Sequence, residues 1–313
     1  MTVASAPGKV ILLGEHSVVY GQPAIAVPVT QVQARAEVRD NEPGLGVTLI
    51  AADLARTLAP FRLQGDNHTE LALARTVRNT LARLGCTGEP DLRITLSSTV
   101  PIGRGLGSGA AVATALVRAL MAHLGGYLTA RDISDLVYQT EMIHHGSPSG
   151  IDNTVIAFGK PLYYIRGECE EIFWPGRPFT LVIADSGLRA ATREVVAGVR
   201  ERWQSDRATY EAHFAAMGEL ARRGRRAISE GNLPELGHLM DANQEALSAI
   251  GVSSPELDRL IAAARRAGAL GAKLSGSGRG GNMVALVAGD APDALRAALT
   301  GAGARSIIVT RVE

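Results

Sequence analysis

A glycine-rich segment at residues 101–111 constrains the fold of this chain more than any other sequence feature. Its glycines, at positions 103, 105, 107 and 109, allow the backbone N–H groups to turn inward around an anion. The segment follows a strand-like run at 92–97 and precedes a helix-like run at 110–124. A glycine-rich turn that leads into a helix N-terminus is a typical phosphate site. The segment therefore predicts a nucleotide-using enzyme.

Composition narrows the partners that such an enzyme could have. The 313 residues suffice for two domains, and 32 Lys and Arg against 31 Asp and Glu give a net charge of +1. This balance favours neither nucleic acid nor a membrane surface as a partner. Cys86 and Cys169 lie far apart in the sequence, so we expect two buried free thiols. Because we find no signal peptide and no apolar run of about 20 residues, we expect a cytoplasmic protein.

The order of strand-like and helix-like runs predicts an α+β fold with two domains, at residues 1–177 and 178–313. Both halves mix strands and helices without the strict alternation of a doubly wound sheet. Polar and apolar residues alternate over 31–38, as in a half-exposed strand, and Thr129, with Asp132 three residues on, is a predicted N-cap. Long helices dominate after Asp185. Strands are predicted at 10–13, 24–29, 31–38, 46–50, 92–97, 161–165, 179–184, 283–287 and 306–310, and helices at 70–84, 110–124, 129–145, 192–228, 233–250, 255–267 and 291–299.

The glycine-rich segment fits neither of two familiar phosphate loops. A P-loop places a lysine on the phosphates, and no lysine occurs between residues 103 and 130. A Rossmann fingerprint is matched loosely by Gly105-x-Gly107-x-x-Ala110. The acidic residue expected about 20 positions later, after a second strand, is missing from the sequence. Another kind of phosphate loop is therefore needed.

Three further segments, at residues 6–24, 141–153 and 273–282, accompany the glycine-rich segment. The order and spacing of the four segments resemble those of the GHMP small-molecule kinases over nearly the whole chain. Within this family, the His-Gly-x-Pro-Ser-Gly-x-Asp-Asn pattern that ends at Asn153 is most similar to the mevalonate kinases. The resemblance implies a two-domain GHMP kinase fold, with a ribosomal-protein-S5-domain-2-like N-terminal domain and a ferredoxin-like C-terminal domain.

The resemblance also implies an activity, the transfer of the ATP γ-phosphate to the 5-hydroxyl of (R)-mevalonate with Mg2+ as cofactor. It implies ATP and mevalonate as ligands, no nucleic acid and no membrane, and it leaves a homodimer open. One alternative is a phosphomevalonate kinase or another small-alcohol kinase of the same family. His16 argues against phosphomevalonate, because that branch usually has a tyrosine there. A second alternative is a non-catalytic ligand-binding protein, although Lys9, Glu141 and Asp152 are all present.

Phosphoryl transfer requires placement and charge neutralisation, and the sequence offers candidates for both. The N–H groups of the glycine-rich segment, with the dipole of the following helix, would hold the triphosphate. Mg2+ prefers oxygen ligands and often takes one or two carboxylates. The resemblance assigns the metal to Glu141, and Ser108 could add a hydroxyl. The predicted nucleotide-binding residues are Pro101, Gly103, Arg104, Gly105, Leu106, Gly107, Ser108, Gly109 and Ala110.

Asp152 and Lys9 are the predicted catalytic residues. Asp152 would orient the acceptor hydroxyl and take its proton, whereas Lys9 would keep that carboxylate ionised and neutralise the γ-phosphate. A histidine or arginine cation with hydroxyl partners would suit a ligand that carries a carboxylate and two hydroxyls. The predicted substrate-binding residues are Glu15, His16, Thr192, Gly276 and Ser277.

Three positions depart from the family pattern. Gly109 stands where members commonly have a second serine, so either Ser108 or a water would replace that metal ligand. Arg279 interrupts a glycine series that is usually unbroken, either as a phosphate-facing cation or as a solvent-facing one. Asn282 replaces the cysteine that usually ends this series.

Overall fold

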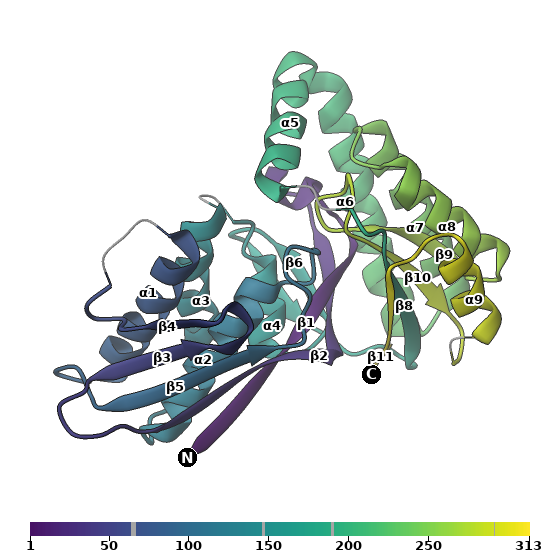
Figure 1. Cartoon of the computed structure of the whole chain (residues 1–313). Helices are drawn as coiled ribbons and strands as arrows, with labels where there is room; N and C mark the ends of the chain where they lie inside the picture. The colour runs from purple at the N-terminus through teal and green to yellow at the C-terminus, as the bar shows by residue number, and fades with distance from the viewer. Residues whose placement is uncertain (64–66, 146–147, 189–190, 291) are drawn as a thin grey trace. The chain divides into compact units, whose positions relative to one another are not determined.

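The structure, a computed structural model, describes residues 1–63, 67–145, 148–188, 191–290 and 292–313, except the side chains of Leu54, His144 and His145. The described residues divide into two compact units (Figure 1). The first unit holds Met1–Gly8, Val32–Ile102 and Gly107–Gly159; the second holds Lys9–Gln31, Gly103–Leu106 and Lys160–Glu313. The chain thus passes between the units several times, and a sequence boundary at 177/178 stays a prediction.

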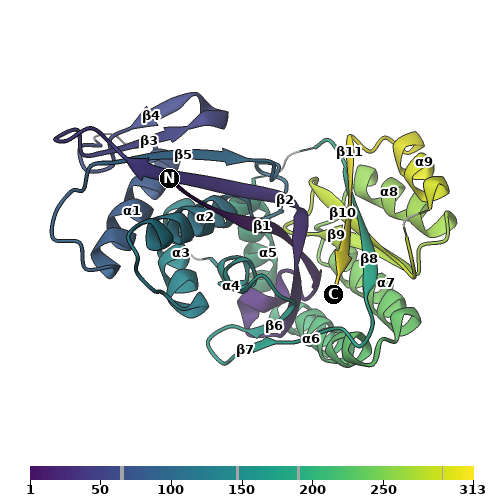
Figure 2. The ribbon, with the colours of Figure 1, turned by 90° about the horizontal axis from the view of Figure 1, so that it is seen from below.

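The first unit is a layer of strands with helices on one face. In it, the later residues of β2 (Ala24–Asp40) pair antiparallel with β5 (Leu92–Ser98), which pairs parallel with β3 (Val47–Ala51). Val32, Ala34 and Ala36 are buried while the residues between them are exposed, as the predicted half-exposed strand requires. Helices α1, α2 and α3 cover one face of these strands (Figures 1 and 2). Its other elements are the start of β1 (Thr2–Leu13), η2 (Ala52–Leu54), β4 (Arg56–Leu58), α1 (His68–Arg83), α2 (Ser108–His123), α3 (Ala130–His145) and α4 (Ile151–Phe158).

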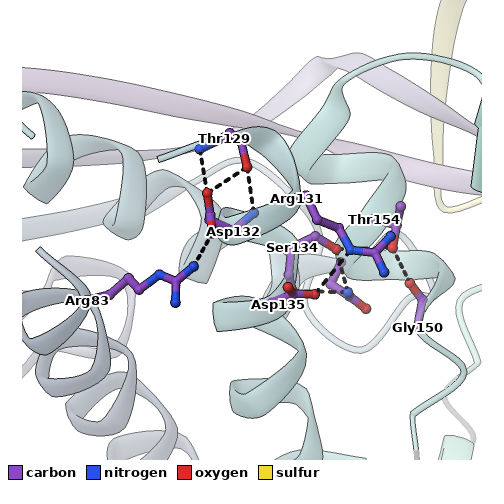
Figure 3. Close-up of polar contacts among 9 residues, drawn as sticks. Arg83, Thr129, Arg131, Asp132, Ser134, Asp135, Gly150 and Thr154 are labelled. Carbon is purple, nitrogen blue, oxygen red and sulfur yellow. Dashed lines mark hydrogen bonds and ion pairs between the residues drawn. The ribbon is translucent and has the colours of Figure 1, made fainter. Parts of the chain in front are cut away.

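Helix α3 begins with a reciprocal cap that the sequence predicts. The Asp132 backbone N–H donates to Thr129 Oγ1 at 3.1 Å, and the Thr129 backbone N–H donates to Asp132 Oδ2 at 3.0 Å (Figure 3). The connection from α2 to α3 is short, so the two packed helices run antiparallel. The start of α2 and the end of α3 therefore lie at the same end of the pair, which places Ser108 and Glu141 at that end.

The second unit contains an antiparallel sheet in the order β11-β8-β10-β9. Helices α7 and α8 pack against β9, and α8 also packs against β10. The core joins Val182 and Ala285 of the sheet to Leu247, Leu257 and Leu299 of the helices. The elements are η1 (Ser17–Tyr20), β6 (Leu162–Ile165), β7 (Cys169–Ile172), β8 (Phe179–Asp185), α5 (Thr192–Ser205), α6 (Arg207–Glu230), α7 (Leu233–Ala249), α8 (Pro255–Arg266), β9 (Gly271–Ser275), β10 (Asn282–Val287), α9 (Asp293–Gly301) and β11 (Ser306–Val312).

An aromatic cluster fixes η1 inside the second unit. Tyr20 stacks on Phe214 of α6 with ring centroids 4.2 Å apart, and it contacts Trp203 of α5 at 5.1 Å. Aromatic pairs of this kind add to the stability that apolar burial already gives. The cluster therefore holds η1 against α5 and α6, directly after Glu15 and His16 in the chain.

Several sequence predictions need correction. The helix predicted over 192–228 is two helices, because Asp206 ends α5 and caps α6 by accepting a bond from the Thr209 backbone N–H. The strands predicted at 24–29 and 31–38 form one strand, β2. Helix α4 and strand β9 had no predicted counterpart. Cys86 and Cys169 are free thiols, as expected, but half-buried rather than buried. Among the described residues, no helix combines the length and the apolar character that spanning a bilayer requires.

Candidate active site

His16 sits at a strained turn in the second unit. Its backbone has φ 60° and ψ −51°, and the Ser17 N–H donates to the Glu15 carbonyl at 2.6 Å, which together define a γ-turn of the rare positive-φ kind. Gly14 precedes it with φ 90°, where a Cβ atom would lie 2.5 Å from the Pro23 carbonyl oxygen. Such strain persists only where the surroundings hold it, and it is common at functional sites.

A buried ion pair lies next to this turn. The Lys273 ammonium of β9 donates to Glu15 Oε1, and the Asn243 amide of α7 donates to Glu15 Oε2 at 3.1 Å. Glu15 is 1% exposed and Lys273 is 0% exposed. Burial raises the pKa of Glu15 and lowers the pKa of Lys273, and their mutual attraction opposes both shifts. This geometry favours a supporting role for Glu15, whose predicted contact with substrate stays a prediction.

The imidazole of His16 is neutral at pH 7. It is 7% exposed, and burial lowers the pKa of His16 to about 4, with the positive charges of Arg202 and Lys273 adding to the shift. Its Nε2 lies 2.9 Å from the Ser277 carbonyl, which can only accept, so Nε2 carries the proton. The expectation that His16 supplies a cation for the substrate is therefore wrong. The group can offer a hydrogen bond but no charge.

This burial predicts that acid destabilises the protein through His16. Between pH 6.5 and pH 4 the unfolded chain protonates this histidine while the folded chain does not. The unfolded state then binds more protons, so the free energy of unfolding should fall by about 3 kcal/mol as the pH drops through this window. Urea titrations at pH 7, 5.5 and 4 should show a smaller loss in His16→Gln. An equal loss in both proteins would contradict the assignment.

Five of the predicted residues, Arg104 among them, meet around a small cavity in the second unit. Gly103, Gly105, Thr192 and Ser277 line it, and Thr192 Oγ1 lies 3.3 Å from Ser277 Oγ. Its volume is about 10 Å3, enough for roughly one water. Gly276 adjoins it, since a Cβ atom on Gly276 would lie 3.6 Å from Gly105 Cα. The remaining lining residues are Arg104, Ser275, Gly278, Gly280 and Gly281.

Lys9 and Leu106 are joined through the backbone in the same unit. Lys9 lies in β1 and is 3% exposed, and its N–H donates to the Leu106 carbonyl at 3.0 Å. This bond fixes the predicted catalytic lysine beside the glycine-rich segment.

The structure decides between the two orientations that the sequence leaves open for Arg279, because its side chain is exposed and donates to the Gly251 carbonyl at 3.3 Å. Arg279 is therefore the solvent-facing cation and not the phosphate-facing one.

In the first unit, α2 begins at the end of the glycine-rich segment. Gly107 caps it in the left-handed region with φ 72°, and Ser108 is its first residue. Pro101 and Ser108 are half-buried, Gly109 is exposed, and Ala110 is buried. The first turn of α2, all of it described, contains no acidic side chain, so the positive end of the helix dipole is not neutralised there. This helix start suits an anion.

Asp152 lies in the first turn of α4, and its neighbours fix that turn to α3. The Asn153 amide donates to the Ser134 carbonyl at 3.1 Å and to Ser134 Oγ at 2.8 Å. Thr154 Oγ1 lies 3.1 Å from Ser134 Oγ and donates to the Gly150 carbonyl at 2.7 Å (Figure 3). Because Asn153 and Thr154 point into the unit, the half-buried Asp152 is held at a fixed position on the helix.

The donor set of the first unit fits Mg2+. Glu141 is buried on the last turns of α3, and Ser108 starts the antiparallel α2. A carboxylate and a hydroxyl are oxygen donors of the kind that Mg2+ takes alongside substrate phosphates and waters. The described residues contain no group of three or more His, Cys, Asp or Glu arranged for a metal, and a magnesium site of this type needs none.

The structure thus groups the predicted residues by unit. The second unit brings together Lys9, Glu15, His16, residues 103–106, Thr192, Gly276 and Ser277, whereas Ser108, Glu141 and Asp152 belong to the first. Sequence reasoning missed Lys273 and Asn243, the partners of Glu15. Lys273 opens the third glycine-rich motif, but its burial inside a strand has no signature in the local sequence. A larger groove of about 560 Å3 in the first unit has none of the predicted residues in its described lining.

Comparison with known proteins identifies the class of enzyme. The profile of the GHMP kinases N terminal domain matches residues 71–160, and that of the GHMP kinases C terminal domain matches residues 225–305. Mevalonate kinase of Pyrococcus horikoshii is 37% identical over 306 residues, covering 92% of this chain and 89% of the relative. Mevalonate kinase of Aeropyrum pernix is 38% identical over 289 residues, covering 90% and 87%.

A solved structure supports the same class of enzyme. The crystal structure of L. major mevalonate kinase in complex with R-mevalonate aligns with a TM-score of 0.81 at 29% identity, covering 100% of this chain and 96% of that one. The chain belongs to the GHMP kinase family, and its two-domain α+β fold is confirmed. Within the family, the relatives named above are mevalonate kinases, which gives the proposed function its substrate.

Proposed function

We propose that this chain is a mevalonate kinase that transfers the γ-phosphate of ATP to the 5-hydroxyl of (R)-mevalonate in the mevalonate route to isopentenyl diphosphate. One observation carries the proposal, the 37% identity to a mevalonate kinase over 92% of the chain. The neutral His16 and the hydroxyls of Thr192 and Ser277 suit a small polyhydroxylated acid. A cytoplasmic location belongs to the same proposal.

The reaction gives distinct roles to the glycine-rich segment, the two predicted catalytic residues and two substrate-binding hydroxyls. The backbone N–H groups of residues 103–109 and the start of α2 bind the triphosphate, which needs charge stabilisation more than covalent chemistry. Asp152 orients the 5-hydroxyl and accepts its proton as the phosphoryl group transfers. Lys9 neutralises the γ-phosphate charge that develops during transfer. Thr192 and Ser277 donate hydrogen bonds to the substrate.

Glu141 and Ser108 would hold the magnesium ion through one carboxylate and one hydroxyl oxygen. When bound, Mg2+ neutralises the phosphate oxygens and orients them for in-line transfer. Gly109 cannot contribute an oxygen from a side chain, so Ser108 takes the place of the serine that the family usually has at position 109.

A substrate panel tests the proposal. ADP release is measured with mevalonate, phosphomevalonate, homoserine and galactose, each with Mg2+ and each after chelation with EDTA. We expect turnover with mevalonate alone, and we expect chelation to abolish it. Turnover only with another alcohol would overturn the substrate, whereas no turnover with any of them would favour the non-catalytic alternative.

A further inference from the structure

Arg104 lies within the glycine-rich segment, yet its side chain is committed to the protein. The residue is 6% exposed, and its Nη1 donates to Asp185 Oδ1 at 2.8 Å and to the Leu188 carbonyl at 2.9 Å. The same Asp185 oxygen accepts a bond from the Gly187 backbone N–H at 2.8 Å. A guanidinium that bound phosphate directly would have to leave these partners. The Asp185 carboxylate is therefore the counter-charge of the Arg104 guanidinium.

The register of the sheet places a second contact beside the first. Asn282 and Asp185 are direct partners in the antiparallel ladder of β10 and β8, so their side chains project from the same face. The Asn282 amide donates to the Arg104 backbone carbonyl. Arg104 is thus held through both its side chain and its backbone by two adjacent residues. The replacement of the usual cysteine by Asn282 supplies a donor that a thiol would supply only weakly.

The segment around Arg104 needs such restraint. Gly103 and Gly105 flank it with φ 68° and φ 75°, and glycine has the most backbone freedom to lose on ordering. Beyond them, the Leu106 carbonyl accepts a bond from the Lys9 N–H. If the segment is already ordered in the free protein, the free energy of ATP binding is not reduced by the cost of ordering it.

We propose that Arg104, Asp185 and Asn282 form a clamp that orders the glycine-rich segment for the triphosphate. The side chain of Arg104 is then a positioning group and not a phosphate ligand, and the segment binds ATP through its backbone N–H groups. The inference rests on the proposed function in one respect, because it takes this segment as the nucleotide site. Arg104 is among the predicted nucleotide-binding residues, and the clamp gives its side chain a positioning role within that segment.

Nucleotide affinity tests the clamp without requiring turnover. The dissociation constant of ATPγS is measured by calorimetry for the full-length protein and for Arg104→Met, Asn282→Ala and Asn282→Cys, with the KM for ATP and for mevalonate measured in parallel. The matched control is Arg265→Met. Arg265 also binds an aspartate, Asp241, at 2.8 Å and a carbonyl, that of Ala272, at 2.9 Å, in the same unit but away from the glycine-rich segment.

We expect Arg104→Met to weaken ATPγS binding about tenfold and to raise the KM for ATP, while the KM for mevalonate stays within about twofold. Asn282→Ala keeps the ion pair of Arg104 with Asp185, so it should weaken ATPγS binding less than Arg104→Met does. The dissociation constant of Asn282→Cys should lie between those of Asn282→Ala and wild type. The double variant Arg104→Met/Asn282→Ala should lose less than the product of the single losses, because the two residues hold one segment.

Three results would overturn the clamp. They are unchanged ATPγS affinity in both Arg104→Met and Asn282→Ala, an equal rise in both KM values, or an equal loss of affinity in Arg265→Met. If wild type binds ATPγS but does not phosphorylate mevalonate, the proposed substrate fails while the clamp is still tested by affinity. If Arg104→Met does not fold, Asn282→Ala decides.

Discussion

Asp152→Asn should lower kcat with mevalonate by about 10²- to 10⁴-fold, with little change in either KM. Asparagine keeps the size of the side chain and a hydrogen-bonding oxygen, but it cannot take the proton of the 5-hydroxyl. The first turn of α4 should be kept, because Asn153 and Thr154 anchor it through hydrogen bonds of their own. The measurement is steady-state ADP release with saturating ATP and Mg2+.

The control for this variant is Asp135→Asn. Asp135 lies on α3 in the same unit, where its Oδ1 is 3.5 Å from Arg131 Nε in an exposed pair (Figure 3). Its loss should leave kcat within about twofold of wild type, because exposed helix pairs contribute little. Near-normal turnover in Asp152→Asn would show that the carboxylate is not the base, and an equal loss in Asp135→Asn would point to damage to the fold.

Lys273→Met should lower the free energy of unfolding by about 3–5 kcal/mol, the largest stability effect that we expect in this chain. The substitution leaves the Glu15 carboxylate buried with Asn243 as its remaining described partner. A buried charge without its counter-charge is far more costly than the loss of the pair as a whole. Urea unfolding followed by circular dichroism at pH 7 measures the change.

Removing both charges should recover much of that loss. In Glu15→Gln/Lys273→Met neither charge of this pair stays buried, so the double variant should be more stable than Lys273→Met alone. Arg223→Met breaks an exposed pair with Glu235 in the same unit and should cost at most about 1 kcal/mol. A loss in Lys273→Met as small as that in Arg223→Met would contradict the importance of the buried pair.

Much of the fold follows from local sequence patterns. The alternation of polar and apolar residues along β2 predicts a strand with one buried face, and Val32, Ala34 and Ala36 form that face. The Thr129 and Asp132 pair predicts the start of α3. These features depend on residues within a few positions of one another, which is why the sequence alone predicts them.

Other features depend on residues that are far apart in the sequence. Glu15 and Lys273 are 258 positions apart, and neither has a neighbour that reveals its burial. The positive φ of His16 arises at a non-glycine residue, which local propensity does not predict. The neutral state of His16 follows from its burial, so residue type alone predicts the wrong charge. The break between α5 and α6 is local, because the Asp206 side chain caps α6, yet the predicted helix over 192–228 runs through it.

The interleaving of the two units has a consequence for dissecting this enzyme into fragments. A cut after Gly159 leaves residues 1–159 with every segment of the first unit, but it deprives residues 160–313 of Lys9–Gln31 and Gly103–Leu106. That C-terminal fragment would keep Lys273 and Asp185 while losing Glu15 and Arg104, so the two buried ion pairs described above would be split. The second unit is therefore compact, but it is not a continuous stretch of sequence. A fragment of residues 160–313 should fold only when residues 9–31 and 103–106 are supplied in trans.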